Sequence, residues 1–300
     1  MLPDPQTDIE VSPAEVASWI QLPPQERPRL IDCREREELE ICQIAGNEWF
    51  PLSTLAETLD RLTVDTERGI VVVNAAGSNA VSAAEHAIAL MLAQARNIPQ
   101  AHMALVDGRW ERSKWEGVEL SDKTLGIIGL GRIGEAVAMR AKAFGMNIIY
   151  NKRSRLPASV EDELGVTFEP DIDRLVARSD IITLHCPLTI DTNKIINADR
   201  IAHMKPNAYV INSSRGELID EDALIAALQS GRIAGAGLDV YTHEPAVDSR
   251  FLSIANAVLL PHLGSATFEG REASGERVIT NIRVWADGHR PPDQVLEGWQ

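Results

Sequence analysis

The stretch Thr124-Leu-Gly-Ile-Ile-Gly-Leu-Gly-Arg-Ile-Gly-Glu135 decides the fold. It opens with the apolar run 125–128, which is typical of a short buried strand. A helical spacing of apolar residues follows over 135–144, and a second apolar run covers 146–150. Strand, turn, helix and strand in this order predict the first βαβ unit of a parallel sheet.

Three glycines lie in the turn of this unit, in the spacing Gly-x-Gly-x-x-Gly. Gly129 permits a tight turn, Gly131 lets the backbone approach a pyrophosphate, and Gly134 lets the helix pack close to the sheet. Free N–H groups at the helix N-terminus favour a bound phosphate. The turn therefore predicts a dinucleotide site; the alternative is a tight packing turn without a ligand.

Composition narrows the class of protein. A length of 300 residues indicates about two domains, and 44% hydrophobic residues are enough for a packed core. The formal net charge of -15 argues against nucleic acid as a partner. No apolar run reaches the roughly 20 residues of a membrane span, and residues 1–5 lack the features of a secretory signal. Three cysteines without metal-ligand spacing favour a reducing cytoplasm.

Strand and helix patterns continue to alternate along the chain. The sequence therefore predicts an α/β protein with a doubly wound parallel sheet, a Rossmann domain, over residues 78–287. Residues 1–77 and 288–300 are expected to form a smaller α/β domain. Further strands are expected at 180–184, 209–212, 234–241 and 257–260. Helices are expected at 81–96, 173–178 and 267–286, and another is expected to open at Asp220.

Three polar residues each follow the end of a different expected strand. These residues, Arg215, Glu244 and His262, belong at the carboxyl edge of the sheet, beside the cofactor. A guanidinium such as that of Arg215 can bind a carboxylate and a carbonyl oxygen of a substrate. An imidazole such as that of His262 can donate a proton near neutral pH, and a carboxylate such as that of Glu244 can keep this donor charged.

These residues lie in motifs that resemble the D-isomer-specific 2-hydroxyacid dehydrogenase family. The motifs are Asn212-Ser-Ser-Arg-Gly-Glu-Leu-Ile-Asp220, Gly237-Leu-Asp-Val-Tyr-Thr-His-Glu-Pro245 and Pro261-His-Leu-Gly-Ser265, and the resemblance covers about residues 74–293. It implies an NAD(P)-dependent oxidoreductase that reduces small 2-oxo acids to D-2-hydroxy acids. Tyr150-Asn-Lys-Arg-Ser-Arg-Leu-Pro157 looks most like the glyoxylate/hydroxypyruvate reductase branch.

The resemblance also implies how the cofactor and a second subunit are bound. Asp239 would contact the nicotinamide carboxamide. The family forms much of a homodimer interface from the region that contains Trp110 and Trp115, although each tryptophan is as compatible with a core as with an interface. The further cofactor residues would be Arg132, Ile133, His185, Pro187, Ser214 and Gly264.

The choice between NAD(H) and NADP(H) depends on the residues after the second strand. An NAD-specific domain places an Asp or Glu there to hold the ribose 2′-hydroxyl. By the family's spacing that position is Lys152, and Arg153, Ser154 and Arg155 follow it. These side chains would pair with a 2′-phosphate. We therefore expect NADP(H) in preference to NAD(H); a solvated basic turn is the alternative.

Residues 12–73 resemble the front half of a rhodanese-like domain. The matching stretches are Leu30-Ile-Asp-Cys-Arg-Glu35, Ile44-Ala-Gly46 and Pro51-Leu-Ser53. A rhodanese places its nucleophilic cysteine after the strand that ends here at Asn74, but the turn reads Asn74-Ala-Ala-Gly77. The chain therefore looks like a natural or engineered chimera, and sulfur transfer is disfavoured.

Two hypotheses about function stay open at this point. In the first, the chain is an NADP(H)-dependent reductase of small 2-oxo acids. In the second, it folds and binds NADP(H) but lacks a complete substrate site, because the family's loops that grip the substrate carboxylate are not recognisable in residues 1–77. No metal ion and no membrane are expected in either case.

Overall fold

The computed structural model describes residues 31–32, 48–49, 75, 77–287 and 289–294. The chain divides into two compact units, Met1–Ala76 with Gly275–Trp299, and Gly77–Ser274 with Gln300. In the first unit, β1 (Ile31–Asp32) pairs in parallel with β2 (Glu48–Trp49). The rest of the rhodanese-like stretch 12–73 lies outside the described residues.

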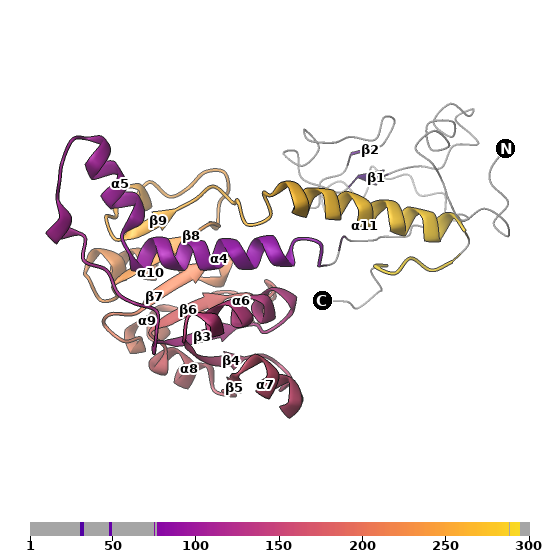
Figure 1. Cartoon of the computed structure of the whole chain (residues 1–300), viewed down its shortest axis with the longest axis horizontal. Coiled ribbons are helices and arrows are strands. Elements are labelled where there is room, and N and C mark those ends of the chain that lie inside the picture. The colour runs from indigo at the N-terminus through magenta and orange to yellow at the C-terminus, as the bar shows by residue number, and fades with distance from the viewer. Residues whose placement is uncertain (1–30, 33–47, 50–74, 76, 288, 295–300) are drawn as a thin grey trace. The chain divides into compact units, whose positions relative to one another are not determined.

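The second unit is built on a parallel sheet of seven strands (Figure 1). The strand order is β5-β4-β3-β6-β7-β8-β9, and each neighbouring pair is parallel. The chain runs from β3 outward to β5, then returns to place β6 beside β3. The switch point of the sheet therefore lies between β3 and β6, where such folds bind their ligands. The strands are β3 (Thr124–Ile128), β4 (Asn147–Asn151), β5 (Val166–Phe168), β6 (Ile181–Leu184), β7 (Tyr209–Asn212), β8 (Gly235–Leu238) and β9 (Ala257–Leu259).

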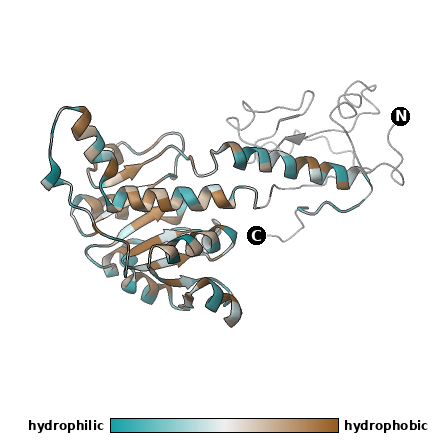
Figure 2. Cartoon of the chain, viewed as in Figure 1, coloured by the Kyte–Doolittle hydropathy of each residue, from teal (hydrophilic) through white to brown (hydrophobic). Residues whose placement is uncertain are grey.

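Helices cover both faces of this sheet. One hydrophobic cluster joins the strands to α8, α9 and α10, and a second joins them to α4 and α6. Figure 2 shows the strands and α4 as largely hydrophobic. The predicted doubly wound parallel sheet is therefore confirmed. The helices are α4 (Ala80–Ala95), α5 (Ile98–Val106), α6 (Arg132–Ala143), α7 (Ala158–Leu164), α8 (Ile172–Arg178), α9 (Ala198–His203), α10 (Glu221–Gln229) and α11 (Phe268–Ala286), with short 3-10 turns at Arg112–Lys114, Gly216–Leu218 and Phe251–Ser253.

The structure differs from the expected elements at the start of α6 and in several short elements. Helix α6 begins at Arg132, three residues before the expected start at Glu135, and Gly131 is its N-cap. Four short elements, α5, α7, β5 and α9, were not expected at all. No helix in the described ranges is both long and apolar enough to span a membrane.

Candidate active site

The glycine turn between β3 and α6 has the geometry that a dinucleotide site requires. Gly129 has a φ of +94°, and a Cβ there would lie 2.4 Å from the backbone nitrogen of Cys186. A Cβ on Gly134 would lie 2.4 Å from the carbonyl oxygen of Gly129, so the helix packs directly on the turn. A Cβ on Gly131 would meet nothing within 4 Å. Gly129 and Gly134 are therefore needed for packing, whereas the space beside Gly131 is open to a ligand.

The first two residues of α6 behave differently from each other. Arg132 is exposed, and its side chain lies against Gly77, where a Cβ would be 3.0 Å from the arginine Cδ. Ile133 is half-buried and packs on the core cluster under α4 and α6. The Arg132 side chain is therefore available at the edge of the glycine turn, and Ile133 contributes mainly to packing.

The basic run after β4 does not act as one unit. Arg153 and Ser154 are exposed and Lys152 is half-buried. Arg155 instead binds Glu161 in a two-pronged ion pair, with Nε 3.0 Å from Oε1 and Nη2 2.7 Å from Oε2. This guanidinium lowers the pKa of the Glu161 carboxyl. The charge of Arg155 is therefore compensated by Glu161. Among the described residues, the side chains of Lys152, Arg153 and Ser154 have no such partner.

Glu161 has a second partner beneath the turn. The hydroxyl of Tyr150, a fully buried residue of β4, donates to Glu161 Oε1 at 2.6 Å and accepts the Leu156 N–H at 2.9 Å. Burial raises the pKa of this phenol, so it remains a donor at neutral pH. The network fixes the course of the chain between β4 and α7, and this fixes where the basic run lies.

Glu244 and His262 are in direct contact. His262 Nδ1 lies 2.6 Å from Glu244 Oε2, and Glu244 Oε1 accepts the Tyr241 N–H at 2.9 Å. The His262 side chain is 46% exposed, and its Nε2 has no partner in the described part of the chain. His262 adopts a φ of 55° and donates its backbone N–H to the Asp239 carbonyl at 2.8 Å. Glu244 therefore holds Nδ1 of the ring, and Nε2 is left without a partner among the described residues.

Arg215 lies on the turn after β7. Its side chain is exposed, donates to the Ser214 carbonyl at 2.6 Å, and pairs with no acid among the described residues. The next residue, Gly216, packs against the loop that carries Glu244, since a Cβ there would lie 2.0 Å from the carbonyl carbon of Tyr241. The arginine and the Glu244–His262 pair are therefore carried by two turns in contact with each other.

Asp239 has a structural task that the sequence did not reveal. Its side chain is fully buried, Oδ1 accepts the Leu263 N–H and Oδ2 accepts the Gly264 N–H, both at 2.8 Å. His86 Nε2, from α4, lies 3.1 Å from Oδ1. Asp239 thus holds the turn that follows His262. His86 was visible in the sequence only as a polar residue in an apolar helix.

The remaining expected cofactor residues lie at the ends of β6 and β7. His185 Nε2 is 2.9 Å from Thr183 Oγ1, and burial lowers the pKa of His185 to about 4, so the ring is neutral at pH 7. Its Nδ1 is buried without a partner among the described residues. Ser214 Oγ donates to the Leu184 carbonyl at 2.6 Å, and Pro187 is exposed.

The assembled site suits proton transfer beside a carboxylate. It offers a guanidinium without an acidic partner among the described residues, an imidazole held by a carboxylate, and a glycine turn open to a phosphate. Among the described residues, no group of three or more histidine, cysteine, aspartate or glutamate side chains could hold a metal ion. The imidazole can exchange a proton, and the guanidinium can bind a carboxylate.

Comparison with known proteins agrees with this geometry. The model of the D-isomer specific 2-hydroxyacid dehydrogenase NAD binding domain matches residues 88–264. The chain belongs to this family. The match includes the glycine turn, Arg215, Glu244 and His262, so the sheet is the nicotinamide-cofactor domain of a family member.

Individual family members are similar over most of the chain. The D-3-phosphoglycerate dehydrogenase of Methanocaldococcus jannaschii is 48% identical over 227 residues, which are 75% of this chain and 43% of that protein. The glyoxylate reductase of Thermococcus litoralis is 46% identical over 237 residues, or 77% of this chain and 71% of that protein. Thus the chain spans less than half the length of the first relative.

A solved structure extends the comparison to a bound cofactor. An acyclic imino acid reductase in complex with NADPH and D-Arg superimposes with a TM-score of 0.70 at 35% identity, covering 77% of this chain and 73% of that one. A protein of similar fold is therefore known in complex with NADPH.

Proposed function

We propose that the protein reduces a small 2-oxo acid, of the glyoxylate or hydroxypyruvate type, to a D-2-hydroxy acid with NADPH. The observation that carries this proposal is the 2.6 Å contact between His262 Nδ1 and Glu244 Oε2, on a turn next to Arg215, which has no acidic partner among the described residues. The glyoxylate reductase of Thermococcus litoralis supports the substrate class.

The residues on the carboxyl edge fit the cofactor. A ligand finds space over Gly131, and His185 Nδ1 and Ser213 Oγ are buried polar atoms without partners in the described part of the chain. When bound there, the nicotinamide supplies the hydride. The phosphates would lie at the N-terminus of α6, where no side chain in the described part of the chain caps the helix.

The chain's own residues would supply binding and the proton. Arg215 would hold the substrate carboxylate, because its guanidinium has no competing acid among the described residues. His262 would donate a proton from Nε2 to the oxygen that forms on C2. Glu244 would fix the tautomer of the ring by accepting from Nδ1.

The preference for NADP(H) is supported by the charges near β4. No acidic side chain occupies the position expected to hold a ribose 2′-hydroxyl, where Lys152 stands. Arg153 and Ser154 are exposed and unpaired by any contact in the described residues. The complex of the imino acid reductase with NADPH is in line with this choice.

Steady-state turnover tests the proposal. The full chain should consume NADPH, followed by its absorbance, with glyoxylate or hydroxypyruvate, and should form the D isomer of the product. Binding of NADPH without turnover on any small 2-oxo acid would instead favour the rival hypothesis, in which residues 1–77 do not complete the substrate site. A thiosulfate:cyanide activity that is lost in Cys33→Ser would instead point to the sulfur transfer that the rhodanese-like residues suggest.

A homodimer through the sheet domain is also proposed. The segment formed by α5 and the turn after it exposes a group of large apolar side chains, and Trp110 is 82% exposed, which favours an interface over a core. Light scattering should give twice the mass of one chain, and Trp110→Ser should shift the protein toward the monomer. A wild-type monomer at high concentration would refute this. The exposed residues are Ile98, Met103, Leu105, Val106 and Trp110.

A further inference from the structure

A backbone contact links α10 to the loop that carries Glu244. Glu221 is the first residue of α10, and its Oε1 accepts the N–H of Thr242 at 2.8 Å. The preceding residue of the loop, Tyr241, donates its own N–H to Glu244 Oε1 at 2.9 Å. Gly216, the residue after Arg215, packs closely against the same peptide. The Tyr241–Thr242 peptide is therefore held between α10 and the catalytic turn.

We propose that Glu221 is a positioning residue for the proton donor. By fixing the Thr242 N–H, it sets the orientation of the neighbouring Tyr241 N–H, which in turn holds one oxygen of Glu244. The other oxygen of Glu244 then meets His262 Nδ1 at 2.6 Å. The inference rests on the proposed function for its effect on rate, but the contact itself is independent of substrate.

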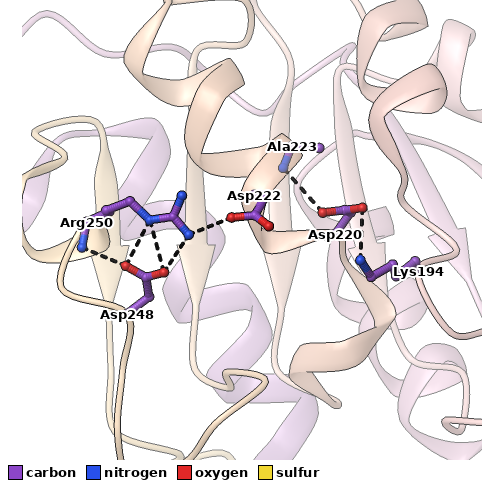
Figure 3. Close-up of polar contacts among 6 residues, drawn as sticks. All are labelled: Lys194, Asp220, Asp222, Ala223, Asp248 and Arg250. Atoms are coloured by element: carbon purple, nitrogen blue, oxygen red, sulfur yellow. Dashed lines mark hydrogen bonds and ion pairs between the residues drawn. The ribbon is translucent and has the colours of Figure 1, made fainter.

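The two acids beside Glu221 have different partners (Figure 3). Asp220 caps α10 at Ala223 and binds Lys194 Nζ at 3.1 Å, and Asp222 binds Arg250 Nη2 at 2.6 Å. Arg250 is also paired with Asp248. The Asp222 side chain is 78% exposed, so water and salt screen its ion pair.

Asp222 therefore provides a matched control. It is adjacent to Glu221 in the first turn of the same helix, carries the same charge and meets the same helix dipole. Its contact is to an exposed side chain, whereas that of Glu221 is to the backbone two residues before Glu244. A role limited to helix stability would make the two acids equivalent, and a positioning role would not.

The experiment uses the full chain with isotope-labelled histidine. The Cε1–H signal of His262 is assigned by its absence in His262→Gln, and its position in Glu244→Gln marks the ring without its charged partner. In Glu221→Ala and in Glu221→Ser, the His262 signal should move toward that position. In Glu221→Gln, which retains an acceptor oxygen, and in Asp222→Ala, it should stay at the wild-type position. Ala is well tolerated in a helix, so folding should be retained, as circular dichroism would show.

Turnover is the second readout. Glu221→Ala should lower kcat roughly 10- to 100-fold, since a displacement on the order of 1 Å costs about that much, and leave the KM for NADPH unchanged. Glu221→Gln should restore most of kcat. A His262 signal that stays at the wild-type position in Glu221→Ala and Glu221→Ser overturns the inference, as does equal loss in Glu221→Ala and Asp222→Ala. A wild-type chain without turnover overturns the proposed function, while the signals still decide the contact.

Discussion

Replacement of Asp239 by alanine should destabilise the protein strongly, because the burial of this carboxylate determines the cost. Both oxygens accept backbone N–H groups, those of Leu263 and Gly264, and the side chain is 0% exposed. Each hydrogen bond to a charged acceptor contributes about 1.5–3 kcal/mol, so the pair contributes about 3–6 kcal/mol. A domain has a total stability of about 5–15 kcal/mol, so Asp239→Ala should remove a large part of it.

Asp171 provides the control for this prediction. Its carboxylate also accepts two backbone N–H groups, from Asp173 and Arg174 at the start of α8, but its side chain is 47% exposed. Loss of such a helix cap costs about 0.5–2 kcal/mol, because water replaces the lost acceptor. Urea unfolding followed by circular dichroism would compare the two alanine variants. Equal losses of unfolding free energy would refute the reasoning from burial.

Three further predictions concern the cofactor, a buried histidine and the proton donor. Arg153→Ala should weaken NADPH binding roughly 10- to 100-fold in a fluorescence titration and leave NADH unchanged, whereas Arg155→Ala should do less, since its guanidinium is already paired; equal losses for NADPH and NADH would contradict this. Burial lowers the pKa of His185 from 6.5 to about 4, so the unfolded chain takes up the proton first as the pH falls. Between pH 6.5 and pH 4, the free energy of unfolding of the wild type should therefore fall by about 3 kcal/mol more than that of His185→Gln, as urea midpoints would show. An equal pH dependence of the two proteins would contradict this prediction. Glu244→Gln should lower kcat/KM on the order of 10²-fold in the turnover assay, and an unchanged value would remove Glu244 from the mechanism.

The sheet was predictable because its signals are local. Short apolar runs mark β3, β4, β6 and β7, and the glycine spacing marks the turn after β3. The start of α6 was misjudged, since Gly134 weakens the helical pattern although its close packing on Gly129 makes it part of the helix. The short elements α5, α7, β5 and α9 give too few turns or alternations for their pattern to stand out.

The site was predictable only as far as topology determines it. Strand ends brought Glu244 and His262 together as expected, because parallel strands share one carboxyl edge. The pairing of Arg155 with Glu161 depends on how α7 packs over β4. The role of Glu221 depends on a contact with Thr242, 21 residues later in the chain. The sequence spacing does not single out Glu161 or Glu221, because α7 and α10 each carry more than one acidic residue.

The strand order has a consequence for how this protein could change. The residues that would choose the coenzyme follow β3 and β4, on one side of the switch point, and Arg215, Glu244 and His262 follow β7, β8 and β9 on the other. Substitutions in groups that share no partner combine additively in free energy. Under the proposed function, substitutions that exchange the coenzyme and substitutions that change the substrate should therefore combine as independent mutations, in either order, so that directed evolution could alter one property at a time.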